Sequence, residues 1–189
     1  MIVIEKPIVL LLSGKARSGK DTFAELIREE VELGNTNIHT DVAILAFADM
    51  LKDVCKRNHY YENKIEDRDI LINIGDDMRA VDKDIFVKPV SQFANVYIEM
   101  GYKLIIITDM RYENEYDCMK QNTNGKVITT RVSSPFDLQG VSEFAKNHPT
   151  ENLNIIPNYE IELPKITNDN YKEIKKRVRN FVNTIVKNS

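Results

Sequence analysis

The chain begins with a change from a continuous apolar run to helical periodicity. Residues 8–12 read Ile-Val-Leu-Leu-Leu without interruption. A short run of this kind, bounded by turn residues, is typical of a strand buried on both faces of a parallel sheet. After a loop that contains glycines, apolar residues recur at helical spacing, at Phe23, Leu26, Ile27 and Val31. The pattern therefore predicts a buried strand, a loop and an amphipathic helix.

The same alternation continues to the end of the chain. Four further apolar runs predict strands at 42–47, 104–108, 127–132 and 159–163. Helical patterns lie between or after them, at 49–57, 65–101, 112–121 and 171–185. In the longest of these, Pro89 must start or kink a helix, and Gly101 is well placed to terminate one. Strands that alternate with helices predict an α/β fold, here a five-stranded parallel sheet with helices on both faces.

Composition narrows the class of protein. At 189 residues, with 42% hydrophobic and 29% charged residues, the chain suits one compact domain. A net charge of -3 gives no reason to expect a nucleic-acid polymer as partner. Cys55 and Cys118 form no C-x-x-C pair, which argues against a disulfide framework or zinc site and favours a reducing cytoplasm. Glu5 and Pro7 interrupt the first apolar stretch, so it is too short for a membrane span and too poor for a secretory signal.

The segment after the first predicted strand carries the strongest chemical signal. It fits the pattern G-x-x-x-x-G-K and comprises Gly14, Lys15, Ala16, Arg17, Ser18, Gly19, Lys20, Asp21 and Thr22. The two glycines let the backbone curl so that several N–H groups face one anion, and the next helix adds its positive N-terminal dipole. Lys20 would reach the β- and γ-phosphates of ATP and stabilise charge as a phosphoryl group moves. With a strand before it and a helix after it, this segment predicts the ATP-binding loop of a kinase.

The position after the lysine departs from the usual pattern. A Ser or Thr that binds magnesium commonly stands there, but this chain has Asp21, with Thr22 next. Asp21 could hold Mg²⁺ through a water molecule, or Thr22 could contact phosphate. The sequence leaves both arrangements open.

Polar side chains follow the third and fourth predicted strands. Asp109 comes directly after the third, and carboxyl ends of parallel strands are where ligands bind in open α/β sheets. Its carboxylate could hold magnesium through water or take the substrate's proton, or it could cap the helix that follows. Arg111 and Arg131 could recognise phosphate in bidentate fashion, although a surface ion pair explains each of them on position alone. Helical segments carry further basic residues for which solvated charge is the default explanation, namely Lys52, Arg68 and Arg79.

Several segments together resemble the deoxynucleoside monophosphate (dNMP) kinases of bacteriophages. The loop at 14–22 resembles that family's variant, including the aspartate after the lysine. Residues 47–52 resemble its Phe-Ala-Asp-x-Leu-Lys segment, and residues 107–115 are similar to its strand-end Ser/Thr-Asp-x-Arg-x-x-Asn-Glu. Residues 148–151, His-Pro-Thr-Glu, are like the His-x-Ser-Glu element before its last strand. The resemblance touches most of the chain in order.

The resemblance implies a nucleoside monophosphate kinase fold that transfers the γ-phosphoryl group of ATP, with Mg²⁺, to a dNMP. It implies ATP phosphates on residues 14–22, Asp109 near the reaction centre and Arg131 at the transferred phosphate or the lid. The residues expected at the acceptor are Asp49, Lys52, Arg68, Arg79, Arg111 and Glu151. The single kinase domain, 1–189, would contain a helical acceptor-binding region at about 48–100 and a lid at about 133–148.

The implied partners are small molecules, ATP and the monophosphate, in the cytoplasm, or in the host cytoplasm for a viral protein. No nucleic-acid polymer or membrane is expected. An exposed face on the long helices could support a homodimer, although no heptad repeat demands one. The predicted lid departs from many such kinases, because residues 133–147 contain Lys146 but no arginine. Arg17 and Arg131 would then supply the catalytic charge.

Two alternatives remain. Animal phosphomevalonate kinases have a similar loop with Lys-Asp and a similar strand-end Asp-x-Arg, so a kinase for another phosphorylated acceptor fits the same residues. A non-catalytic nucleotide-binding switch is the alternative from a different class, suggested by GTPase-like tetrapeptides at 137–140 and 63–66. Their chain order is reversed relative to a GTPase, and the second ends in Glu rather than Asp, which argues against a switch.

Overall fold

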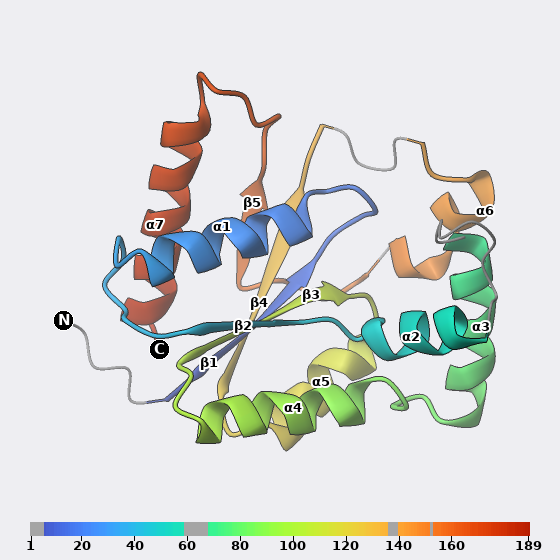
Figure 1. Cartoon of the computed structure of the whole chain (residues 1–189). Coiled ribbons are helices and arrows are strands. Elements are labelled where there is room, and N and C mark those ends of the chain that lie inside the picture. The colour runs from blue at the N-terminus through green and yellow to red at the C-terminus, as the bar shows by residue number, and fades with distance from the viewer. Residues whose placement is uncertain (1–5, 59–67, 136–139, 152) are drawn as a thin grey trace.

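The centre of the protein is a five-stranded parallel sheet (Figure 1). The computed structural model describes residues 6–58, 68–135, 140–151 and 153–189. In chain order the strands are β1 (Ile8–Ser13), β2 (Val42–Leu45), β3 (Leu104–Met110), β4 (Lys126–Ser133) and β5 (Tyr159–Glu162). Their order in the sheet is β2-β3-β1-β4-β5, and every neighbouring pair is parallel. The loop that follows β1 therefore leaves the middle of the sheet, between the ends of β3 and β4.

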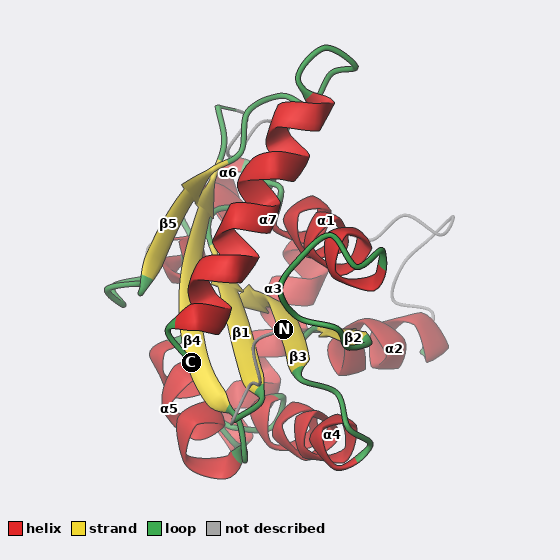
Figure 2. Ribbon diagram, turned by 90° about the vertical axis from the view of Figure 1, so that its left-hand side faces the viewer, coloured by secondary structure: helices red, strands yellow, loops and turns green. Residues whose placement is uncertain are grey.

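Helices connect the strands and cover both faces of the sheet, as parallel neighbours require. One face is covered by α1 (Lys20–Glu32) and α7 (Tyr171–Lys187), and the other by α4 (Val87–Glu99) and α5 (Glu113–Asn122) (Figure 1, Figure 2). A further group lies beyond the carboxyl ends of the strands, at the right of Figure 1, and consists of α2 (Asp49–Arg57), α3 (Arg68–Val81) and α6 (Glu143–Lys146). A 3₁₀ turn, η1 (Pro149–Glu151), follows α6. The predicted α/β architecture, a five-stranded parallel sheet between helices, is confirmed.

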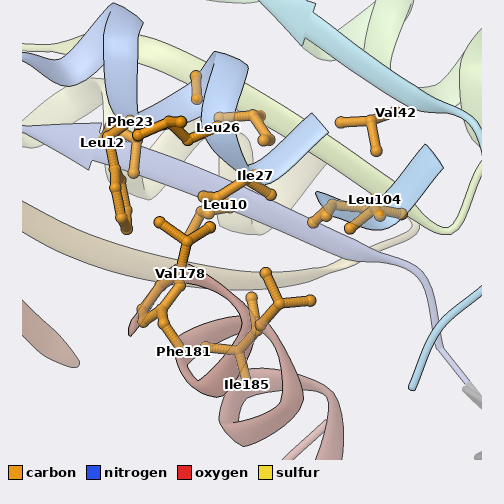
Figure 3. Close-up of a cluster of buried hydrophobic side chains, with 14 of the residues drawn as sticks. Leu10, Leu12, Phe23, Leu26, Ile27, Val42, Leu104, Val178, Phe181 and Ile185 are labelled. Atoms are coloured by element: carbon orange, nitrogen blue, oxygen red, sulfur yellow. The ribbon is translucent and has the colours of Figure 1, made fainter. Parts of the chain in front are cut away.

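Alternate side chains of the central strands enter two separate cores, since successive residues of a strand point to opposite faces. In β1, Leu10 and Leu12 pack toward α1 and α7, whereas Leu11 packs toward α4 and α5. Figure 3 shows the first core, in which Phe23 of α1 and Phe181 of α7 meet the sheet. Their ring centroids are 5.3 Å apart. Burial of β1 on both faces explains its uninterrupted apolar sequence and makes it a rigid base for the loop at its end.

The long helical segment predicted at 65–101 is two helices, α3 and α4, with a turn between Val81 and Val87. Pro89 lies in the first turn of α4, where a missing N–H costs no helical hydrogen bond. Gly101, with φ 99°, follows the end of α4 as the predicted terminator. Residues 59–67 and 136–139 lie outside the described residues, and with them parts of the predicted acceptor region and lid and most of both GTPase-like tetrapeptides. Within the described ranges, no helix combines the length and the apolar character needed to cross a bilayer.

Candidate active site

The loop between β1 and α1 has the backbone that a phosphate-binding loop requires. Gly14 has φ 143°, and a Cβ atom placed there would lie 2.1 Å from the carbonyl O of Val132 on β4. Gly19 has φ 85°, and its Cβ would lie 2.7 Å from Cδ2 of Leu163. Glycine is required at the first position because the opposing atom is backbone, and the left-handed φ favours it at the second. Arg17, with φ 64°, is the one described non-glycine residue with positive φ, a kind of strain that is found at ligand sites.

Lys20, the first residue of α1, is folded back into this loop. Its ammonium group donates hydrogen bonds to the carbonyl O of Gly14 and of Lys15, both at 2.8 Å, and to Oγ of Ser18 at 3.2 Å. The residue is only 7% exposed. Burial lowers the pKa of Lys20 to about 8, Arg111 acts in the same direction, and nearby carboxylates offset the shift only in part. The charge of this lysine is therefore sensitive to any anion that enters the loop.

A cavity of about 460 Å³ opens beside Lys20 at the carboxyl ends of the strands. Its walls come from the loop, α2, α3, the end of β3 and residues 148–150. Most of the residues predicted for the site line it, namely Ala16, Arg17, Lys20, Asp21, Asp49, Lys52, Arg68, Arg79, Asp109 and Arg111. Aliphatic side chains, Leu71 and Ile72 of α3 among them, line much of the remainder, together with polar residues such as Asp76 and His148. The cavity thus combines basic groups with an apolar wall, as a site for a small anionic molecule requires.

Two arginines from different elements converge on one buried carboxylate. Arg68, at the start of α3, and Arg111, just after β3, donate to the same Oε1 of Glu151, at 2.5 and 2.8 Å. The other oxygen, Oε2, accepts the N–H of Ala16 in the loop at 2.7 Å. Burial alone would raise the pKa of Glu151, but these donors outweigh it and leave the pKa lowered. The carboxylate is therefore ionised at neutral pH and holds both guanidinium groups at one wall of the cavity.

Arg79 of α3 lies between two aromatic rings. Its guanidinium carbon is 4.7 Å from the ring centroid of Phe86 and 4.2 Å from that of Tyr112. The Tyr112 hydroxyl donates to Asp76 at 3.1 Å, and burial raises the pKa of Tyr112 to about 12. Asp76 also lies 2.9 Å from Nε2 of His148. These contacts fix the arginine and connect α3 both to the end of β3 and to the segment after α6.

Asp109 lines the cavity and also holds the chain that enters α2. Its two carboxyl oxygens accept the backbone N–H groups of Phe47 and Ala48, at 2.7 and 2.9 Å. Because these N–H groups bond to a side chain, β2 ends at Leu45, whereas the apolar run predicted a strand to residue 47. Burial is the largest influence on Asp109 and raises its pKa, although the two N–H groups and Arg111 act against it. The carboxylate therefore binds the backbone at the start of α2, and the predicted cap of the helix that follows β3, α5, is not observed; its role in catalysis stays a prediction.

Glu115 of α5 supports Arg111. It ends the segment at 107–115 that resembles the dNMP kinases, but the sequence assigns it no role. Its carboxylate accepts the N–H of Arg111 at 2.6 Å and that of Tyr112 at 3.0 Å. Burial raises the pKa of Glu115 to about 8, and nearby Asp109 acts in the same direction. The sequence feature that could reveal this role is the spacing of Tyr112 and Glu115. A Glu three residues after the N-cap forms the capping box at the start of α5. Glu115 thereby sets the direction in which Arg111 leaves the backbone.

The structure does not bring Arg131 to this cavity. Its guanidinium donates to the carbonyl O of Leu153 and of Ile155, at 3.2 and 2.8 Å, and lies 3.6 Å from a carboxyl oxygen of Glu160. The role at the transferred phosphate that the resemblance implied finds no support in this placement. Thr22 is exposed on α1 and is also absent from the described lining of the cavity.

The sequence matches a known family. A family model described as phosphomevalonate kinase matches residues 12–125, which is more than half of the chain. The chain belongs to the phosphomevalonate kinase family. It is therefore a P-loop kinase, an ATP-dependent phosphotransferase, and the match covers the loop at 14–22 together with Arg68, Arg79, Asp109 and Arg111. The narrower resemblance to phage dNMP kinases is not confirmed by this match, and no curated protein matches the chain.

Solved structures share the fold of this member of the phosphomevalonate kinase family. The APS kinase CysC of Mycobacterium tuberculosis, in complex with AMPPNP and APS, aligns with a TM-score of 0.57 and 10% identity, over 97% of this chain and 99% of that chain. A sugar kinase from Janibacter sp. HTCC2649, solved without ligand, aligns with a TM-score of 0.50 and 12% identity, over 95% of this chain and 93% of that one. At these identities the likeness concerns the fold alone.

Asp21 is the residue best placed to meet the metal that a P-loop kinase uses. It is exposed, lines the cavity and follows Lys20 directly. Within the described part of the chain, no three His, Cys, Asp or Glu side chains form a group that could hold a metal on their own. Magnesium at kinase sites is bound through one or two carboxylates together with water and the phosphates of the nucleotide. The exposed carboxylate of Asp21, directly after the ATP-binding lysine, fits Mg²⁺ that arrives with ATP.

Proposed function

We propose that this protein transfers the γ-phosphoryl group of ATP to the phosphate group of a small phosphorylated acceptor, and that this acceptor is phosphomevalonate. The observation that carries the proposal is the cavity beside the ATP-binding loop, into which Arg68, Arg79 and Arg111 project their charge. Guanidinium groups bind phosphate in bidentate fashion, so three of them suit an acceptor that already carries a phosphate. Membership of the phosphomevalonate kinase family supports the choice of acceptor.

The residues would divide the work between the two phosphates. The loop N–H groups and Lys20 bind the β- and γ-phosphates of ATP, and Arg68 and Arg111 bind the acceptor phosphate. An oxygen of the acceptor phosphate forms a bond to the γ-phosphorus while the bond from that phosphorus to the β–γ bridging oxygen breaks, and ADP leaves. Mg²⁺ bound with ATP would neutralise charge on the β- and γ-phosphates.

An acceptor phosphate also explains why the site manages without a free general base. The second pKa of a phosphate monoester is about 6, so the attacking oxygen is already ionised at neutral pH. Asp109 is therefore not needed as a proton acceptor, and both of its carboxyl oxygens can bond to the N–H groups of Phe47 and Ala48. These two bonds would help to orient α2, the helix that carries Asp49 and Lys52 into the cavity wall.

A dNMP is the second candidate acceptor. The observation that favours it is that the segments resembling phage dNMP kinases meet at one cavity, because residues from 47–52, 107–115 and 148–151 all line it. The ring of Tyr112 is covered by Arg79, so a base would rest against Leu71 and Ile72 and not on that ring. Asp49 and Lys52 would then offer polar groups to its edge.

An acceptor panel tests the proposal. ADP formation is measured with ATP, Mg²⁺ and, in separate reactions, phosphomevalonate, dGMP, dTMP, dCMP and dAMP. We expect acceptor-dependent ADP with phosphomevalonate, and loss of nearly all of it in Lys20→Ala. Turnover with a dNMP but not with phosphomevalonate would refute phosphomevalonate as the acceptor and support the dNMP. Tight GTP binding without any acceptor-dependent transfer would refute both and support the nucleotide-binding switch.

A further inference from the structure

One buried carboxylate joins three of the segments that surround the cavity. Glu151 ends η1, and its side chain is 1% exposed. It accepts the N–H of Ala16 from the ATP-binding loop, a guanidinium N–H of Arg68 from α3, and one of Arg111 from the end of β3. The nucleotide loop and the two arginines proposed to bind the acceptor are thus tied to the same two oxygen atoms.

Glu151 lies behind the arginines and does not line the cavity. Its partners Ala16, Arg68 and Arg111 all belong to the cavity wall, as does the preceding residue Thr150, whereas Glu151 does not. A guanidinium group has five N–H donors in a fixed planar fork, and the contact with Oε1 engages one terminal nitrogen of each arginine. Nε of Arg68 is buried, so the remaining terminal N–H groups are the ones left to meet an anion in the cavity. The position of Glu151 therefore suits a residue that orients the arginines, in contrast to the direct contact with substrate expected from the sequence.

The negative charge of Glu151 allows the two positively charged arginines to bond to the same oxygen atom. Burial lowers the pKa of Arg68, the neighbouring charge of Arg111 lowers it further, and Glu151 acts in the opposite direction. Without the carboxylate, two like charges would repel each other and separate. A neutral Gln cannot replace it, because one end of the amide is an NH₂ group and would face either the arginines or the Ala16 N–H, donor against donor.

We propose that Glu151 is a positioning residue of this kinase. It holds Arg68 and Arg111 in the orientation in which they bind the acceptor phosphate, and it fixes that pair relative to the ATP-binding loop through Ala16. This inference rests on the proposed function, in which those two arginines receive the acceptor phosphate. Glu151 ends η1, which follows α6 closely in the chain. The two arginines are therefore ordered only when α6 and η1 are in this position.

The test compares Glu151→Gln and Glu151→Asp with Glu143→Gln, which alters an exposed carboxylate of α6 that pairs with Lys146. For whichever acceptor the wild type phosphorylates, we expect Glu151→Gln to lower kcat about 100-fold and raise the acceptor KM about tenfold, since small misplacements of binding groups have effects of this order. The KM for ATP should change by less than about threefold, because Lys20 and most of the loop are untouched. Glu151→Asp keeps the charge and should recover part of the loss, whereas Glu143→Gln should behave as the wild type.

Wild-type kcat and acceptor KM in a folded Glu151→Gln protein would overturn the inference, because a merely structural residue changes only the melting temperature. A lower acceptor KM would also overturn it, since Glu151 would then compete with the acceptor for the arginines. If Glu151→Gln fails to fold, the binding of inorganic phosphate to Glu151→Asp is measured in the presence of AMPPNP. We expect weaker binding than in the wild type, and equal binding would refute the role. That binding test also decides the role of Glu151 if no acceptor in the panel is used, an outcome that defeats the proposed function alone.

Discussion

Lys20 gives ATP binding a predicted dependence on pH. In the ligand-free protein its pKa is lowered to about 8 from the usual 10.5, because the side chain is buried. The phosphates of ATP place negative charge beside the ammonium group, which returns the pKa toward its usual value. Below about pH 8, Lys20 is protonated with and without ATP, and the affinity does not change with pH. Above about pH 8, the free protein loses a proton that the complex keeps, so ATP binding takes up a proton and the affinity falls.

The difference between the two pKa values sets the size of the effect. A difference of about 2.5 corresponds to about 300-fold in affinity, or ~3.4 kcal/mol. Proton uptake should be about one half at pH 8 and about nine tenths at pH 9, so the dissociation constant should rise about fivefold between these two pH values and approach tenfold per pH unit above them. Because Lys20 is only 7% exposed, solvent screens its interaction with the phosphates little.

Calorimetric titration with AMPPNP and Mg²⁺ measures both quantities when it is done at about pH 7, 8 and 9 in buffers of different ionisation enthalpy. Lys20→Arg is the matched control, since a guanidinium stays protonated throughout this range. Constant affinity from about pH 7 to 9 with no proton uptake would refute the contact between Lys20 and the phosphates. Equal slopes in the wild type and in Lys20→Arg would assign the titration to another group, such as Glu115.

Three other substitutions separate stability from chemistry. Glu115 has a folded pKa of about 8, above its unfolded value of 4.5, so its contribution to stability is complete below about pH 4.5 and is lost as pH rises through about 8. Glu115→Gln keeps an acceptor for the two N–H groups without a charge, so urea unfolding at about pH 5.5 and 8.5 should show a smaller fall in stability than in the wild type; an unchanged slope would contradict the raised pKa. Gly14→Ala should lower the free energy of unfolding by at least ~2 kcal/mol and abolish AMPPNP binding, because its Cβ would meet a β4 carbonyl O at 2.1 Å; wild-type affinity would count against the loop geometry. Asp109→Asn should cost ~1–2 kcal/mol of stability through the lost bonds to the start of α2. A large fall in kcat of the folded Asp109→Asn protein would add a catalytic role, and unchanged stability would contradict these bonds.

Local pattern predicts the elements that bear on the sheet and the ATP-binding loop. The run at 8–12 is buried on both faces because β1 lies between β3 and β4, and an uninterrupted apolar strand needs such a position. The glycine spacing of the loop likewise follows from backbone geometry within a few residues. The buried strand and the glycine loop each depend on residues that are close in sequence, so a sequence pattern can predict them.

The contacts that assemble the site join residues far apart in sequence, and no local pattern contains them. Ala16 and Glu151 bond across 135 positions, and this bond ties η1 to the ATP-binding loop. Arg131 stands at a strand end like Arg111, but the carbonyl groups of Leu153 and Ile155 turn its guanidinium away from the cavity. Position in the sheet does not distinguish the two arginines, because the difference arises from a segment that lies 22 to 24 residues further along the chain.

The same limit applies to residues that the sequence does not single out. Asp76 and Tyr112 carry no signal of their own, and although His148 opens the segment at 148–151, only the fold brings all three into one chain of contacts with Arg79. For Asp109, helix capping and catalysis were equal alternatives by position. The structure shows a third arrangement, because its carboxylate accepts the N–H groups of Phe47 and Ala48 at the start of α2 and not those of α5, the helix that follows.

Phosphorus NMR of the reaction mixture tests the central claim most directly. After incubation of ATP, Mg²⁺ and the active acceptor, the signal of the acceptor phosphate should be replaced by two coupled signals of a diphosphate, with one ADP formed for each acceptor consumed. The Lys20→Ala protein should leave the acceptor signal unchanged. ADP that appears with inorganic phosphate while the acceptor signal persists would contradict phosphoryl transfer to an acceptor phosphate.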